Sequence, residues 1–110
     1  MNNSLTKHNF KEKVLDNTIL TLVKFKTEWS GPCQIIYPVY AELAKSYRGI
    51  AEFFCVDIDK DELLHREYGV SELPTILFFR SGKIIDHAVG LIPKNQLIAK
   101  IENALNSSQN

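Results

Sequence analysis

Two kinds of apolar pattern alternate along this chain, and their order constrains the fold more than any other feature of the sequence. Nearly continuous runs of β-branched and aromatic residues occupy positions 18–26, 51–59 and 75–79. Such runs are typical of strands covered on both faces. Between and around them, apolar residues recur at helical spacing. The order predicts helix, strand, helix, strand, helix, strand, strand, helix, with a further short strand near residues 2–5.

Strands separated by helices imply parallel crossovers, whereas the last two strands form an antiparallel hairpin across residues 80–83. We therefore expect an α/β fold, with a central mixed sheet of four to five strands flanked by about four helices.

Turn and capping residues place the helices. The first is expected over residues 7–16. The second follows the turn that ends at Cys33 and stops before Gly49. Pro38 should kink this second helix, because its ring disrupts the preceding turn.

The remaining helices lie in the second half of the chain. Asp59 is expected to cap a short helix over residues 60–69. Pro93 opens the last helix. Its apolar stripe consists of Leu97, Ile101, Ala104 and Leu105.

The size and charge of the chain limit its function. With 110 residues, of which 45% are apolar, it forms one domain over residues 1–110, with a flexible tail at 106–110. Acidic and basic residues balance at 13 each, which argues against binding nucleic acid or an anionic membrane. No apolar leader or membrane span is visible, so we expect a cytoplasmic monomer.

The stretch EWSGPCQ, residues 28–34, is the strongest chemical signal. Two cysteines spaced C-x-x-C at a strand-to-helix turn exchange disulfides, because the helix N-terminus lowers the pKa of the first thiol. The second thiol then resolves the mixed disulfide. Here a serine, Ser30, stands where the first cysteine of C-x-x-C would be. Cys33, at the second position, is the only thiol of the turn.

An ordered series of motifs resembles the thioredoxin family over nearly the whole chain. The series is LVKF-x-x-EW, SGPC, VDID, GV-x-x-LPTILFF, SGK and VG-x-x-x-x-x-QL. The resemblance implies a thioredoxin fold, with a cis bond before Pro74 that faces the SGPC turn. It also implies an active-site shell containing Gly31 and Pro32, and a surface that docks extended peptides. That surface would consist of Trp29, Leu73, Pro74, Thr75 and Gly90.

Three departures from the family pattern fall at this site. Ser30 occupies the place of the nucleophilic cysteine, Lys24 replaces a buried aspartate, and Cys55 lies where many members carry a lysine. Ser30 is interpreted as a helix N-cap, because none of the three histidines is close enough along the chain to activate it as a nucleophile.

The two thiols and the lysine leave alternatives open. Cys33 is either a reactive thiol or an inert buried side chain, and Cys55 is most simply a buried strand residue. Lys24 either points under the turn, where it would favour a thiolate, or extends its ammonium to water. A Cys33–Cys55 disulfide requires Cα atoms within about 7 Å.

Two functions fit this pattern. The first is a thiol-disulfide oxidoreductase of the thioredoxin family, acting in redox homeostasis, whose dithiol activity is weak or absent because serine replaces the nucleophile, by design or naturally. The alternative is a redox-inactive or monothiol binding module that acts through Cys33. The expected partners are proteins carrying disulfides or thiols, with a thioredoxin reductase among the candidates. Neither a cofactor nor a metal is expected, since the chain has no spaced ligand cluster and no phosphate-binding glycine loop.

Overall fold

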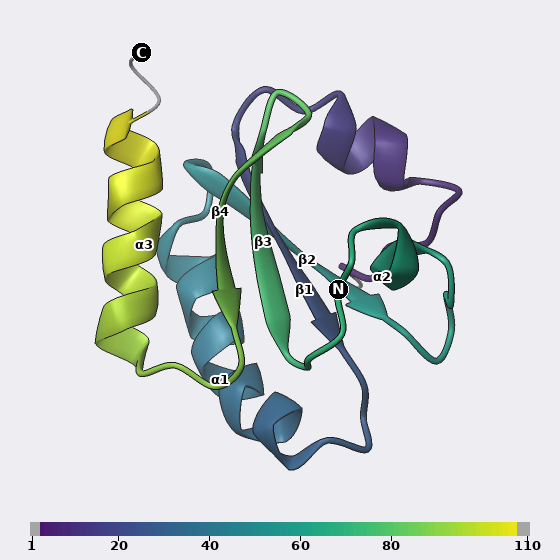
Figure 1. Cartoon of the computed structure of the whole chain (residues 1–110). Helices are drawn as coiled ribbons and strands as arrows, with labels where there is room; N and C mark the ends of the chain where they lie inside the picture. The colour runs from purple at the N-terminus through teal and green to yellow at the C-terminus, as the bar shows by residue number, and fades with distance from the viewer. Residues whose placement is uncertain (1–2, 108–110) are drawn as a thin grey trace.

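A computed structural model describes residues 3–107 (Figure 1). The elements, in chain order, are η1 (Lys11–Leu15), β1 (Leu20–Lys26), α1 (Gly31–Ser46), β2 (Ala51–Asp57), α2 (Leu64–Glu67), β3 (Thr75–Arg80), β4 (Lys83–Val89) and α3 (Lys94–Ser107). The four strands form one sheet in the order β2-β1-β3-β4. Strand β1 pairs in parallel with β2 and antiparallel with β3, and β3 pairs antiparallel with β4. The mixed sheet predicted from the sequence is therefore confirmed.

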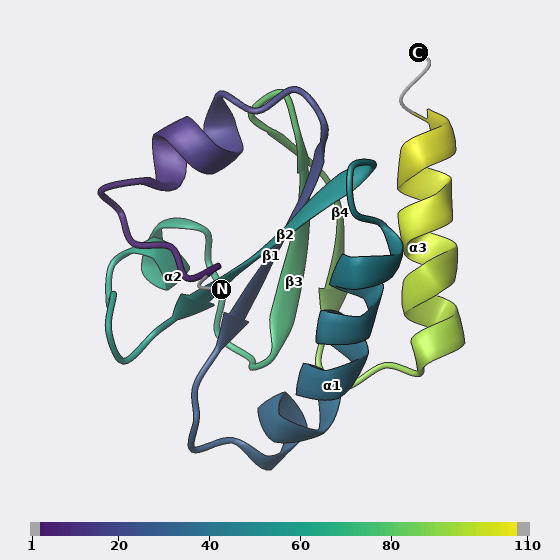
Figure 2. The ribbon, with the colours of Figure 1, turned by 180° about the vertical axis from the view of Figure 1, so that it is seen from behind.

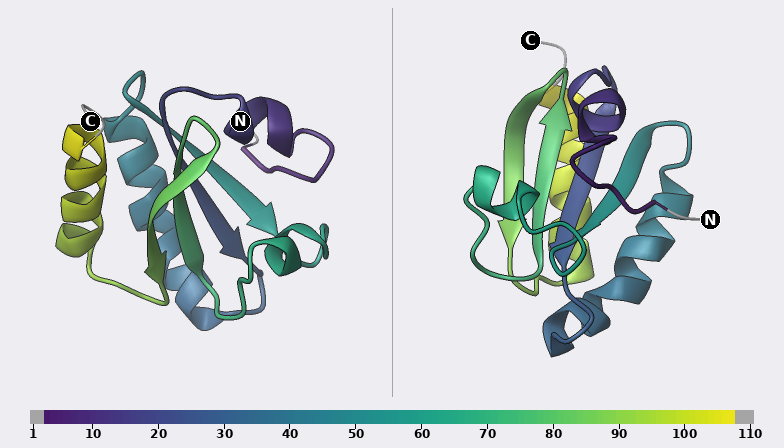
Figure 3. Two further views of the ribbon diagram at one scale, coloured as in Figure 1. Left: turned by 45° about the horizontal axis from the view of Figure 1, so that its top comes forward. Right: turned by 90° about the vertical axis from the view of Figure 1, so that its right-hand side faces the viewer.

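Helices cover both faces of the sheet, as Figures 2 and 3 show. Helices α1 and α3 pack on one face, and η1 and α2 pack on the other. Because side chains alternate along a strand, the sheet contributes to two apolar clusters. One contains Leu20 and Leu22 of β1 beneath α1 and α3. The other contains Val23 and Phe25 against the opposite layer.

The strands are shorter than the apolar runs because polar side chains bind the backbone at their ends. Asn17 Oδ1 accepts a hydrogen bond from the Ile19 N–H (3.1 Å), so β1 begins at Leu20 rather than at residue 18. Asp57 Oδ1 accepts from the Asp59 N–H (2.9 Å), which turns the chain and ends β2 at Asp57 rather than at residue 59.

Two helices also differ from the expected ranges. The first is a single wide turn over Lys11–Leu15, in which the Asp16 N–H donates to the Lys11 carbonyl (2.8 Å). The helix expected over residues 60–69 is reduced to Leu64–Glu67. Asp61 Oδ1 accepts from the N–H groups of Leu63 (3.1 Å) and Leu64 (3.2 Å), so Asp61 rather than Asp59 binds the backbone where the helix begins.

The longer helices begin and end at the expected signals. Gly49, with φ of +83°, follows α1 in a backbone conformation that disfavours side chains. The Pro93 carbonyl accepts from the Gln96 (3.0 Å) and Leu97 (3.1 Å) N–H groups and so starts α3.

Both chain ends differ in part from the sequence expectation. Helix α3 continues through Asn106 and Ser107, because its apolar stripe stays packed on the sheet; the rest of the tail expected at 106–110 lies outside the described residues. The short strand expected near residues 2–5 is a single parallel bridge between Ser4 and Cys55. No helix within residues 3–107 is long and apolar enough to cross a membrane.

Candidate functional site

Strand register gathers the predicted site residues at one end of the sheet. Strand β1 ends there and leads through residues 27–30 into α1. Because β3 runs antiparallel to β1, Thr75 at its start lies opposite Phe25. Val89 at the end of β4 lies opposite Thr75 in turn. The SGPC turn, the Leu73–Pro74 segment and Gly90 therefore share one edge of the molecule.

Ser30 is the N-cap of α1. Its backbone is extended, and its Oγ accepts a hydrogen bond from the Cys33 N–H at 3.3 Å. This contact satisfies one of the first-turn N–H groups that have no partner within the helix. Pro32 lies in the same turn, where its missing N–H leaves no unpaired group. The capping role inferred for Ser30 from the sequence is thus observed.

The two side chains that bracket the turn differ in exposure. Trp29 is 87% exposed, so the indole covers little of the core. Cys33 lies in the first turn of α1 and is only 4% exposed. Gly31 and Pro32 between them are exposed. The turn therefore exposes an apolar surface and keeps its thiol covered.

The second segment of this edge is the Leu73–Pro74 loop. The Leu73–Pro74 peptide bond is cis, and Pro74 is buried while Leu73 is half-buried. The Pro74 carbonyl accepts from the Gly90 N–H at 2.7 Å. Gly90 has a φ of +79°, and a side chain there would also approach Glu72 Oε2 to 3.0 Å. Position 90 therefore favours glycine for two independent reasons.

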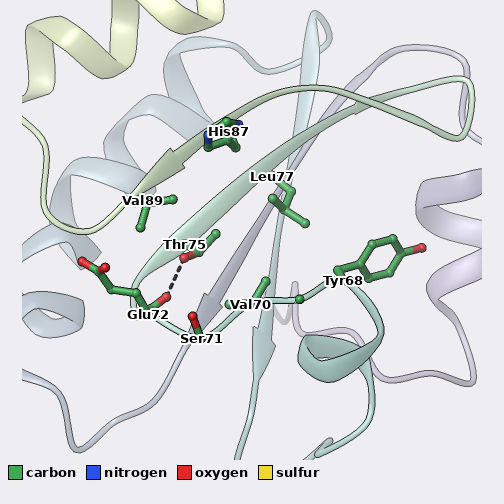
Figure 4. Close-up of a pocket in the computed structure, with 9 residues that line it drawn as sticks. Tyr68, Val70, Ser71, Glu72, Thr75, Leu77, His87 and Val89 are labelled. Carbon is green, nitrogen blue, oxygen red and sulfur yellow. Dashed lines mark hydrogen bonds between the residues drawn. The ribbon is translucent and has the colours of Figure 1, made fainter.

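A small hollow of about 320 Å³ adjoins this loop (Figure 4). Thr75 Oγ1 donates to the Glu72 carbonyl at 2.5 Å, and both residues line the hollow together with His87 and Val89 of β4. Within the described part of the chain, the His87 imidazole makes no hydrogen bond to a serine or cysteine. The hollow therefore extends the edge around Pro74 and contains no nucleophile paired with a base.

Lys24 lies in the middle of β1 and is 2% exposed. Its Nζ lies 4.6 Å from the centroid of the Tyr40 ring and 5.4 Å from that of Tyr37. Of the two orientations that the sequence left open, the structure has the buried one, in which aromatic faces contact the ammonium in place of water. Burial lowers the pKa of Lys24, and the nearby thiols of Cys55 and Cys33 oppose this shift.

Tyr40 is a site residue that sequence reasoning missed, because its helical spacing indicated only a core position. Its hydroxyl donates to the carbonyl oxygens of Phe54 (2.7 Å) and Leu22 (3.1 Å). These bonds hold the ring under the Lys24 ammonium. Burial raises the pKa of Tyr40 well above its ordinary value.

Cys55 lies directly beside Lys24 in the parallel register of β1 and β2. Burial raises the pKa of its thiol, and the Lys24 ammonium opposes the shift. Both cysteines are free thiols. Lys24 therefore has one thiol from β2 and one from α1 in its surroundings; the sequence raised only the α1 thiol, Cys33, as a neighbour.

Comparison with known proteins agrees with this geometry. The family model described as Thioredoxin matches residues 2–103. The chain is 36% identical to the thioredoxin of Chlorobaculum thiosulfatiphilum over 97 residues, which cover 88% of this chain and 90% of that protein. It is 34% identical to the thioredoxin of Rickettsia felis over 105 residues, covering 96% and 100% of the two chains. It is 35% identical to thioredoxin 1 of Nostoc sp. over 101 residues, covering 92% and 94%.

Proposed function

Because this chain belongs to the thioredoxin family, we propose that it docks protein partners carrying disulfides or thiols but is a weak dithiol reductase. The observation that carries the proposal is the side chain at position 30. A serine hydroxyl caps α1 where dithiol exchange requires a sulfur. The docking surface comprises Trp29, Leu73, Pro74, Thr75 and Gly90.

The chemistry follows from the single thiol of the turn. A Cys33 thiolate can attack a partner disulfide, forming a Cys33–partner disulfide and releasing the other partner sulfur as a thiolate. Completing the reduction requires a second thiol to attack the new bond. Ser30 cannot supply it, so the reaction stops at the mixed disulfide unless an external thiol, such as glutathione, releases the partner.

A second candidate function is a monothiol or redox-inactive binding module. The burial of Cys33 and the lysine at position 24 favour it, because the supporting residues of the site differ from the family pattern together with position 30. In this case Trp29 and the Pro74 segment serve docking alone. A thioredoxin reductase is a further candidate partner, although without a thiol at position 30 the turn cannot form the C-x-x-C disulfide that such an enzyme would reduce.

The test is insulin reduction with dithiothreitol, comparing the chain with Ser30→Cys and with Ser30→Ala as matched control. We expect background rates for the chain and for Ser30→Ala, and a large gain for Ser30→Cys. A rate near that of an ordinary thioredoxin for the unchanged chain would contradict the proposal.

The same variants separate the two candidate functions. If Ser30→Cys stays at background although it folds, the site has lost its capacity for proton transfer and the binding module is supported. Accumulation of a mixed disulfide with a model disulfide peptide, lost in Cys33→Ala and retained in Cys55→Ala, would support monothiol exchange.

A further inference from the structure

We propose that the cavity beside Lys24 binds a small amphipathic carboxylate, an apolar aromatic group carrying one carboxylate. The carboxylate would pair with the Lys24 ammonium, and the aromatic group would lie between α1 and β2. The cavity borders the SGPC turn, because Trp29 and Cys33 also line it, but Pro74 and Gly90 do not.

The cavity is large enough for such a ligand. It has a volume of about 920 Å³ and is lined mainly by residues of α1 and of the outer strand β2. Figure 2 shows α1 and β2 on this side of the molecule. Typical small-molecule sites measure about 300–1,000 Å³. Two small residues of α1, Ala41 and Ala44, line it about one turn apart.

Lys24 gives the cavity an unmatched positive charge. Although it is 2% exposed, Lys24 is in none of the ion pairs formed within residues 3–107. The contacts of its ammonium with the Tyr37 and Tyr40 rings offset only part of the lost hydration. A carboxylate in the cavity would supply the missing counter-charge.

The acidic residues around the cavity do not supply that charge. Glu28 forms an ion pair with Lys26 at 3.9 Å. Glu52 accepts a hydrogen bond from the Asn17 side-chain amide. Two further cations that line the cavity, Lys45 and Arg48, add to its attraction for an anion.

The walls next to Lys24 favour an aromatic group. Phe53 is 5% exposed and packs edge to face on Tyr40, with ring centroids 5.2 Å apart. The Tyr37 ring, with its centroid 5.4 Å from the Lys24 ammonium, also lines the cavity and is exposed. A flat apolar ligand could contact these rings while its charged end reaches Lys24.

The single charge at the deep end favours a monocarboxylate over a phosphate. A phosphate dianion is bound in proteins by several donors together, such as arginine forks or clustered backbone N–H groups. Lys24 is one point charge among aromatic rings and thiols. One carboxylate matches it.

The test uses 3-phenylpropionate as the probe and its neutral amide, 3-phenylpropanamide, as the matched ligand. Binding to the full chain is measured by calorimetry and located by amide chemical shifts. We expect saturable binding of the carboxylate, with shifts in β1, β2 and α1. The amide should bind at least about tenfold more weakly, as losing a charge-assisted hydrogen bond implies.

Two variants and a control complete the design. Lys24→Met keeps the length of the side chain and should weaken binding of the carboxylate at least about tenfold, while binding of the amide stays the same. Lys13→Met removes an exposed lysine outside the cavity and should change neither. Ala41→Phe, which fills the cavity but keeps Lys24, should weaken both ligands.

The proposal is overturned by any of three results: no binding of 3-phenylpropionate, equal binding of the amide and the carboxylate, or unchanged binding of the carboxylate in a folded Lys24→Met variant. Shifts confined to Pro74, Gly90 and their neighbours, which lie outside the cavity, would also overturn it. None of these results depends on reductase activity, so the proposed function is tested separately.

Discussion

Ser30 acts on the fold through a single hydrogen bond at the start of α1, from the Cys33 N–H to its Oγ. Ser30→Ala removes the acceptor, and we expect it to lower the free energy of unfolding by about 1 kcal/mol. Ser30→Asp retains an acceptor and should stay close to the original chain. Urea unfolding followed by circular dichroism measures the difference. Equal stability of the alanine variant and the original chain would show that the cap contributes nothing.

Lys24 should change how stability depends on pH. Burial lowers the pKa of Lys24 in the folded chain below its ordinary value of 10.5. Between the folded-state pKa and 10.5, the unfolded chain therefore binds more protons than the folded one. Through this group, the free energy of unfolding therefore rises with pH in that window. Cys55 acts in the opposite direction from about its ordinary pKa of 9.0 upward, because its folded-state pKa is raised. Tyr40 does the same from about 10.0 upward.

Comparison with Lys24→Met removes the lysine together with its effect on the Cys55 thiol, whose pKa the ammonium lowers. Urea unfolding at a series of pH values up to 10.5 should show the original chain gaining stability relative to Lys24→Met as the pH rises through the window below 10.5. A difference that does not change with pH would mean that the Lys24 pKa is the same in the folded and unfolded chains.

Single residues also mark the limit of sequence reasoning. Ser30 could be assigned as a cap because capping is local and depends on the residue and its position. The orientation of Lys24 could not be decided, because it depends on Tyr40, sixteen positions away in the chain and fixed by bonds to β1 and β2. Helical spacing indicates that Tyr40 faces the sheet but not which strand residue it meets.

At the scale of elements, Tyr40 ties α1 to the two strands beneath it. Tyr40→Phe keeps the ring but removes the donor to the Phe54 and Leu22 carbonyls, and we expect it to cost about 1 kcal/mol of unfolding free energy. Tyr37→Phe is the matched control, because Tyr37 is 65% exposed. Urea midpoints at equal m-values would measure both. If the two variants were equally stable, the buried hydroxyl would have no net effect.

The elements were predicted in the right order, and their errors have a common cause. Asn17, Asp57 and Asp61 each bind backbone N–H groups at the end of an element and shorten what the apolar pattern alone suggests. Apolar periodicity reports which face is buried, whereas such side chain-to-backbone bonds decide where an element stops. The wide turn of η1 could not be predicted from residues 7–16 either, because the same residue types also favour an ordinary short helix.

At the scale of the whole molecule, one sheet carries both apolar clusters, which should make the chain unfold as one unit. Its Cα radius of gyration, 12.8 Å, is close to the value of about 13 Å expected for a compact domain of this length. Helix α3 is the element that we expect to separate most readily from the rest of the fold, because it follows the edge strand β4 and packs on the sheet through one stripe. That stripe includes Ile101, which is fully buried.

Ile101→Val tests whether α3 unfolds together with the rest of the molecule. The lost methylene should cost about 0.5–1.5 kcal/mol. If unfolding is global, the slowest-exchanging amides of β1, and those of η1 on the opposite face, should lose protection by the same free energy that urea unfolding reports. If protection falls only within α3, the helix opens on its own. The remaining sheet would then be a smaller cooperative unit, and residues 3–107 would not form a single folding domain.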